Sequence, residues 1–183
     1  MATPRPVPLT AFQVRPAVAA DAGTLYPLWL RAREHNARVD PRIVLAPVAP
    51  EQFEAALRSQ VERGTASVFV AECGGDIAGF ISGAIESAGP DRLPERHATI
   101  GYLWVEPMYR RRGIARALVG AIARWAAAID GVRHFEMPVL AADEEAARFW
   151  AALGFRPFIA RLWAPLEPGR RPSREPALPR SPR

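Results

Sequence analysis

The sequence contains no lysine, a single cysteine and no long apolar run. The single cysteine, Cys73, excludes an internal disulfide and a metal site built from several cysteines. No stretch approaches the roughly 18 consecutive apolar residues of a membrane-spanning helix. The proline-spaced N-terminus also lacks the apolar centre of a signal peptide. We therefore expect a cytoplasmic protein that does not bind a membrane.

Because lysine is absent, all 24 basic residues are arginine, and the formal net charge is +5. Much of this excess lies in the proline-spaced residues 168–183, which include a single acid, Glu175. Such a segment cannot bury a core, so the sequence predicts a disordered Arg/Pro-rich tail over 167–183 and a flexible proline-rich N-terminus over 1–10. Nucleic-acid binding through this arginine-rich tail is disfavoured, because it lacks an aromatic stacking platform or a reading helix. The rest of the chain is nearly neutral.

Residues 11–166 carry strand and helix patterns that are typical of one α/β domain. Apolar periodicity and turn residues predict helices over 21–36, 50–64, 112–129 and 144–153, and strands over 12–18, 67–72, 77–85, 99–105, 135–140 and 158–165. The sequence Cys73-Gly-Gly-Asp76 predicts a tight hairpin, which makes its two strands antiparallel. We expect a central mixed, largely antiparallel sheet with helices on both faces.

The clearest chemical signal is the segment 102–119, where a strand runs through a basic turn into a helix. The first turn of a helix has free N–H groups and the positive end of the helix dipole, which together favour phosphate. Gly113 lets the backbone come close to such a group. Further donors that match phosphate oxygens come from Arg110, Arg111, Arg112 and Arg116. No Gly-Lys-Ser/Thr follows, so the segment is not a Walker A loop.

Two motifs resemble the signatures of the GNAT N-acetyltransferase superfamily. The first, Arg110-x-x-Gly113-x-Ala115, is similar to the acyl-CoA signature Gln/Arg-x-x-Gly-x-Gly/Ala. The second signature of the family is Asn-x-x-Ala-x-x-Phe-Tyr-x-x-x-Gly-Phe, and the matching segment is Asp143-x-x-Ala146-x-x-Phe149-Trp150-x-x-x-Gly154-Phe155. The order and spacing of the expected elements also fit, so the resemblance covers about residues 11–165.

The resemblance implies transfer of an acetyl group from acetyl-CoA to a primary amine of a small molecule or peptide, without a metal. In this family the sheet opens between the strand ending at Val105 and the strand ending near Leu140. Backbone groups of Leu103 and Val105 would pair with the pantetheine arm, and N–H groups of 111–116 would hold the pyrophosphate. The resemblance assigns cofactor binding to Leu103, Trp104, Val105, Arg110, Arg111, Arg112, Gly113, Ile114, Ala115, Arg116, Asp143 and Trp150.

The sequence departs from the family at the positions that handle protons. Many relatives carry Glu or His at the positions of Thr99 and Gly101, and Tyr at the position of Trp150. Thr99 and Gly101 cannot act as a base, and the indole of Trp150 cannot act as an acid. The candidate bases are His97 and Glu86, with Glu95 and Glu106 as further acids near the same strand. Imidazole titrates near neutral pH, and alternation places His97 on the same side of its strand as Thr99.

The identity of the base therefore stays open at this point. A non-catalytic acyl-CoA-binding module of the same fold is an alternative, because both the usual base and the usual acid are missing. The sequence also leaves open the acceptor, the length of the acyl group and whether the protein forms a homodimer.

Overall fold

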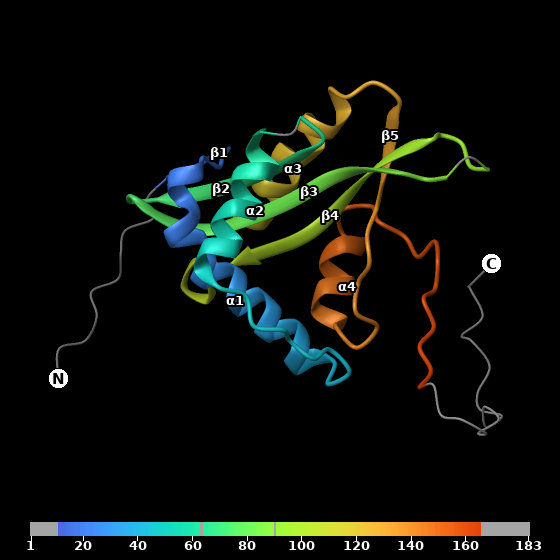
Figure 1. Cartoon of the computed structure of the whole chain (residues 1–183), viewed down its shortest axis with the longest axis horizontal. Helices are drawn as coiled ribbons and strands as arrows, with labels where there is room; N and C mark the ends of the chain where they lie inside the picture. The colour runs from blue at the N-terminus through green and yellow to red at the C-terminus, as the bar shows by residue number, and fades with distance from the viewer. Residues whose placement is uncertain (1–10, 63, 90, 166–183) are drawn as a thin grey trace.

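A computed structural model of the protein describes residues 11–62, 64–89 and 91–165 (Figure 1). The two predicted tails, 1–10 and 167–183, lie outside these residues. Along the described chain the elements are β1 (Phe12–Pro16), α1 (Ala22–Val39), α2 (Pro50–Glu62), β2 (Ala66–Cys73), β3 (Asp76–Ser87), β4 (Arg96–Val105), α3 (Ile114–Ala127), β5 (Val132–Glu136) and α4 (Glu144–Ala151). Two 3-10 turns, η1 (Ala19–Asp21) and η2 (Pro107–Tyr109), precede α1 and α3.

The strands form one mixed sheet in the order β1-β2-β3-β4-β5. The first four strands are antiparallel neighbours, whereas β5 runs parallel to β4. The β2–β3 turn consists of Gly74 (φ +62°) and Gly75 (φ +91°), between the paired residues Cys73 and Asp76. Two consecutive residues with positive φ are what a type I′ turn requires, so the glycines explain the hairpin. The predicted fold class is confirmed.

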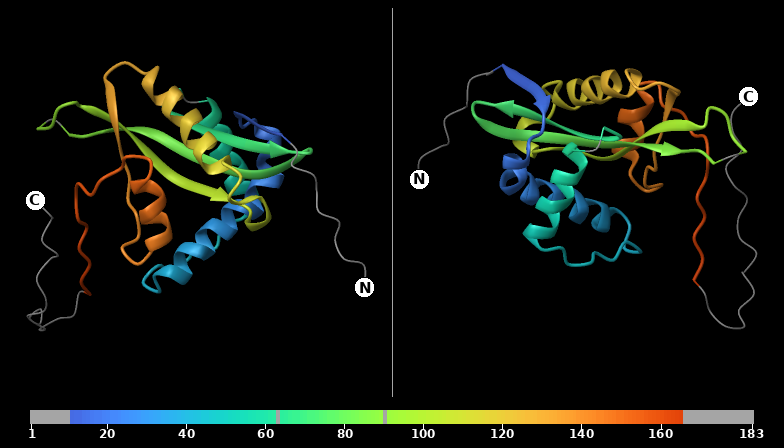
Figure 2. Two further views of the ribbon diagram at one scale, coloured as in Figure 1. Left: turned by 180° about the vertical axis from the view of Figure 1, so that it is seen from behind. Right: turned by 45° about the horizontal axis from the view of Figure 1, so that its top comes forward.

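Helices cover both faces of the sheet, with α1 and α2 on one side and α3 on the other (Figure 2). On the α3 side, Leu118 and Ile122 are fully buried and pack in one cluster with Ile81 of β3. On the other side, Leu25 of α1 packs in a cluster with Val70 of β2. The central strands β2, β3 and β4 contribute to both clusters because their side chains alternate between faces. The two cores fix α1 and α3 against opposite faces of the same strands.

The sheet opens between β4 and β5. Their parallel pairing ends at Thr99, opposite Glu136, although β4 continues to Val105. Among the described residues, this second half of β4 has no strand partner on the β5 side. Figure 1 shows α4 lying beside this half of β4. The opening places backbone groups of β4 next to the helix that follows β5.

Two sequence-based expectations about strands are wrong. Residues 155–165 contain no regular secondary structure, so the expected strand over 158–165 does not form. Its large apolar side chains come in neighbouring pairs rather than at alternate positions, so they cannot share one face of a sheet. These side chains stay exposed: Phe158, Ile159, Leu162 and Trp163.

The strand expected over 135–140 instead runs from Val132 to Glu136. Pro138 follows soon afterwards, and proline has no N–H with which to continue a ladder. β5 therefore ends at Glu136, earlier along the chain than the predicted end at Leu140, and the opening in the sheet begins there.

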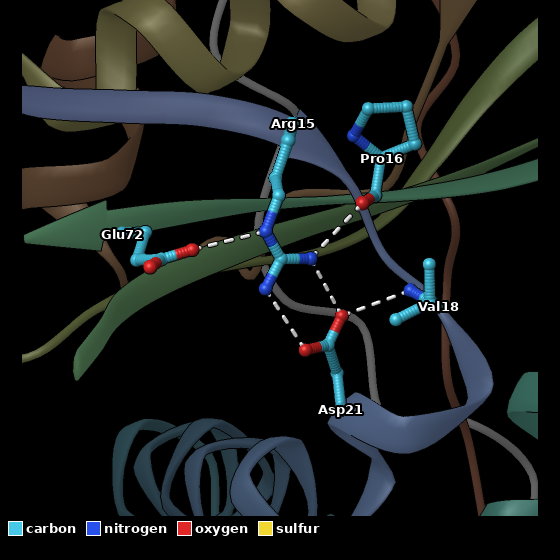
Figure 3. A network of polar contacts seen from close by, with 5 residues as sticks. All are labelled: Arg15, Pro16, Val18, Asp21 and Glu72. Carbon is cyan, nitrogen blue, oxygen red and sulfur yellow. Dashed lines mark hydrogen bonds and ion pairs between the residues drawn. The ribbon is translucent and has the colours of Figure 1, made fainter. Parts of the chain in front are cut away.

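A polar network joins the first strand to the start of α1 (Figure 3). Arg15 donates two hydrogen bonds to the carboxylate of Asp21, at 2.8 and 3.0 Å, and one to Glu72 at 3.0 Å. Asp21 also accepts from the backbone N–H of Val18 at 2.8 Å. The hydrogen bonds from Arg15, helped by Val18 and opposed by burial, hold the pKa of Asp21 below its usual value. The ionised carboxylate therefore stabilises the folded protein.

We expect Asp21→Asn to lower the free energy of unfolding at pH 7 by about 1–2 kcal/mol, because two charge-assisted hydrogen bonds are lost. A depressed pKa in the folded state stabilises the protein above the ordinary aspartate pKa, and this contribution disappears as pH falls through the folded value. Urea unfolding at pH 7 and in acid measures the difference between wild type and variant, which should shrink in acid. Glu54→Gln, in the exposed Arg58–Glu54 pair, is a control with little effect. An equal difference at both pH values would contradict the assignment.

Candidate active site

A cleft of about 900 Å³ lies at the opening beside β4. Its walls come from α1, from β4 between Ile100 and Val105, from the turn and first residues of α3, from residues 137–140 and from α4. The cleft is thus lined by segments from both faces of the sheet.

The turn before α3 places the open end of that helix at the cleft. Arg111 (φ +62°) and Gly113 (φ +82°) both have left-handed backbone conformations, and Gly113 is the N-cap residue. The first N–H to bond back along the helix is that of Ala117, which donates to the carbonyl of Gly113 at 3.0 Å. The N–H groups of residues 114–116 therefore have no intrahelical acceptor, and all three residues line the cleft. Backbone donors and the helix dipole together make this wall of the cleft suitable for an anion.

Arg110 fixes the end of β4. Its Nε donates to the carbonyl of Val105 at 2.9 Å, and its guanidinium lies 4.9 Å from the ring centre of Trp104. Arg111 and Arg116 also line the cleft. Arg112 is not part of the lining, and its guanidinium lies over the ring of Tyr109 at 5.9 Å.

Most of the residues expected to bind the cofactor are brought together by the fold. Those that line the cleft are Leu103, Trp104, Val105, Arg110, Arg111, Gly113, Ile114, Ala115, Arg116, Asp143 and Trp150. Trp150 is 94% buried, with edge-to-face contacts to Phe149 and Phe155, both at 5.0 Å. It is therefore a packed wall of the cleft.

Asp143 joins two helices across the cleft. Its Oδ1 accepts from the backbone N–H of Ala146 at 2.9 Å and caps α4, while its Oδ2 lies 3.1 Å from Nε2 of His35 on α1. The sequence analysis did not select His35, which belongs to no motif. Ala32, His35 and Asn36 all line the cleft. Their i, i+3, i+4 spacing places them on one face of α1, and this spacing could have identified His35 from the sequence.

The two candidate bases, His97 and Glu86, lie outside this lining. They face each other across β3 and β4, in the part of β4 that pairs with β5. His97 is buried, its Nε2 lies 4.0 Å from Glu86, and its ring stacks on that of His134 at 5.9 Å. Gly101 lines the cleft, whereas Thr99 does not.

The described residues contain neither a candidate membrane span nor a candidate metal site. No helix in residues 11–62, 64–89 and 91–165 is long and apolar enough to cross a membrane. No group of three or more His, Cys, Asp or Glu side chains in the same residues could hold a metal ion.

A model of the acetyltransferase (GNAT) family matches residues 27–155, which is more than half of the chain. The protein therefore belongs to the GNAT acetyltransferase family, as its two motifs predicted. The family match spans the cleft, from α1 to the residues that follow α4.

Solved structures with the same fold include several acetyltransferases. An aminoglycoside N-acetyltransferase in complex with CoA is 18% identical, with a TM-score of 0.65 over 90% of this chain and 98% of that chain. Glucosamine-6-phosphate N-acetyltransferase from Arabidopsis thaliana is 15% identical, with a TM-score of 0.64 over 86% and 99%. A protein from Bacillus halodurans is 22% identical, with a TM-score of 0.72 over 84% and 99%. A search of curated protein sequences found no significant match.

Proposed function

We propose that this protein is an acetyl-CoA-dependent N-acetyltransferase that acts on a primary amine of a small molecule or peptide. One observation carries the proposal: the open N-terminus of α3 and the half of β4 without a β5 partner lie in a single cleft. A diphosphate suits the helix end. An extended arm that contains amides suits the strand edge. CoA contains both of these groups, and a solved relative of the same fold is a complex with CoA.

The residues present fit the cofactor. Backbone N–H groups of residues 114–116, with the side chains of Arg111 and Arg116, would hold the diphosphate. Backbone groups of Leu103 and Val105 would pair with the pantetheine arm. Arg110 would keep this end of β4 in place through its hydrogen bond to the Val105 carbonyl. Acetyl-CoA supplies an acyl group that is activated as a thioester.

Around the reacting centre, the chain would orient the acyl group and exclude water. A backbone N–H near Val105 would donate to the acyl oxygen, where negative charge develops. Trp104 and Trp150, both buried, would form apolar walls there. A low-dielectric wall strengthens the single hydrogen bond. The acceptor amine would attack the carbonyl carbon directly, without a covalent enzyme intermediate.

A specific observation favours the second candidate, a non-catalytic acyl-CoA-binding module. The positions that often hold a base or an acid in this family hold Thr99, Gly101 and Trp150, and Trp150 is packed between two phenylalanines. This candidate shares the cofactor cleft and differs from the first in turnover alone.

Release of free CoA thiol across a panel of amines tests the proposal. We expect acetyl-CoA to bind in calorimetry and to be turned over with at least one aminoglycoside, amino-sugar phosphate or peptide N-terminus. Binding without turnover across the whole panel would favour the module. An absence of binding would overturn both candidates.

A further inference from the structure

We propose that His35 is the base that removes the proton from the acceptor amine, and that Asp143 is the residue that positions its imidazole. This assignment rests on the acetyl transfer proposed above. It also supplies the missing base from α1, an element that neither sequence motif includes.

The two side chains meet inside the cleft. His35 comes from α1 and Asp143 from the start of α4, and Nε2 of the imidazole lies 3.1 Å from Oδ2 of the carboxylate. Figure 1 shows α4 beside the second half of β4 and the later part of α1 close to α4. Asp143 is itself fixed, because its other oxygen caps α4 through the N–H of Ala146. A carboxylate held at one oxygen can orient the imidazole with the other.

This contact determines which nitrogen of His35 can accept a proton. An ionised carboxylate only accepts hydrogen bonds, so the hydrogen of the neutral imidazole must lie on Nε2. The lone pair is therefore on Nδ1. An imidazole whose donor nitrogen is held by a carboxylate is the arrangement of a general base in many enzymes.

His35 is also accessible and close to the reacting centre. Its side chain is 37% exposed, whereas that of Asp143 is 13% exposed. The His35 ring centre lies 5.9 Å from that of Trp104 at the end of β4, where the acyl carbonyl is expected. Of the three histidines in the chain, His35 is the one that lines the cleft. A substrate amine can therefore reach this histidine and not the buried His97.

Several charged residues line the cleft that contains the imidazole. Besides Asp143, α4 contributes Glu145 and Arg148, and the opposite wall contributes Arg110, Arg111 and Arg116. On α1 itself, Arg31 is bound to Glu106 at 2.6 Å, and Arg33 donates to the carbonyl of Ala46 at 2.8 Å. The other charged residues near His35 along the helix are Glu34 and Arg38.

Nδ1 of His35 takes one proton from the ammonium form of the acceptor, which frees the nitrogen lone pair. That pair forms the bond to the carbonyl carbon as the carbon–sulfur bond breaks, and the electron pair of the broken bond leaves on sulfur. The nitrogen then gives up a second proton, which converts the thiolate to the thiol. The proton held by His35 passes to water, so one proton is released per turnover.

His35→Gln tests the assignment directly. We expect kcat to fall by about 10²–10⁴-fold, the range for loss of a general base, with the Kd of acetyl-CoA unchanged within about threefold. The fall of kcat/KM at acid pH, which we expect in the wild type, should be absent from this variant. His134→Gln is the matched control, because His134 is 38% exposed and its Nε2 lies 3.1 Å from Glu136, outside the cleft lining. This control should keep the activity of wild type.

The tautomer provides a readout that does not depend on turnover. Long-range proton–nitrogen NMR spectra of the full chain, assigned with single-histidine variants, should show hydrogen on Nε2 and none on Nδ1 of His35 above neutral pH. Asp143→Asn should weaken this preference and shift the acidic limb of kcat/KM. An Nδ1–H tautomer in wild type would overturn the assignment. So would an active wild type whose His35→Gln variant is equally active, whereas a wild type without turnover overturns the proposed function itself.

Discussion

Gly113→Glu is expected to weaken acetyl-CoA binding by at least about 100-fold, which corresponds to roughly 2.7 kcal/mol. Gly113 caps α3 and lines the cleft, and a Cβ built on it meets no atom within 4 Å. The new side chain therefore extends into open space within the cleft. Its carboxylate would occupy the positive end of the helix and repel the diphosphate, and like charges held together cost several kcal/mol. Isothermal titration calorimetry with acetyl-CoA measures the loss.

Two further variants separate charge from backbone strain. Any side chain at Gly113 (φ +82°) costs about 1–2 kcal/mol of stability, because a Cβ disfavours the left-handed conformation. Gly113→Ala carries this strain without the charge, so the additional loss of affinity in Gly113→Glu measures the carboxylate. Gly74→Glu adds the same charge at φ +62° in the β2–β3 turn, also with open space around it. Wild-type affinity in Gly113→Glu would place the diphosphate elsewhere.

Gly79→Ala is expected to lower the free energy of unfolding by about 1–3 kcal/mol. A Cβ at Gly79 would lie 2.5 Å from the carbonyl oxygen of Trp104 and 3.1 Å from the Cα of Val105. Both atoms belong to the backbone of β4, so the added methyl group must push two paired strands apart. Urea unfolding of the variant and of wild type measures the difference.

Because Trp104 and Val105 line the cleft, Gly79→Ala should also weaken acetyl-CoA binding. The control is Gly120→Ala in α3, where the nearest atom to the added Cβ is the end of Arg124 at an ordinary 3.5 Å. Alanine favours a helix over glycine, so this variant should be as stable as wild type or up to about 1 kcal/mol more stable. Equal stability of Gly79→Ala and wild type would show that β3 and β4 separate there at no cost.

The fold and the open N-terminus of α3 at the cleft could be predicted because their signals are local. A glycine pair at a hairpin and a basic turn before an apolar helix act through neighbouring residues, and the structure places both as the sequence indicates. The expected strand over 158–165 failed because a strand also needs a partner, which no local pattern supplies. The end of β5 before Pro138 could have been recognised from that proline alone.

The contact between His35 and Asp143, by contrast, could not be predicted from the sequence. His35 and Asp143 are 108 residues apart in sequence, and only the packing of α1 and α4 around the opening in the sheet brings them into contact. The second motif identifies Asp143, but nothing in it identifies the partner of that side chain. The contact is a tertiary property, whereas the motifs describe single segments of the chain.

The half of β4 beyond Thr99 is a free strand edge on the β5 side, and it lies in the cleft. Exposed edges are templates for aggregation, since their N–H and carbonyl groups can pair with any extended chain. Here α1 and α4 both line the space beside the edge and are joined across it by His35 and Asp143. A narrow arm can enter such a space more easily than a second polypeptide with its side chains. The walls of the cleft thus restrict access to a strand edge that could otherwise pair with another extended chain.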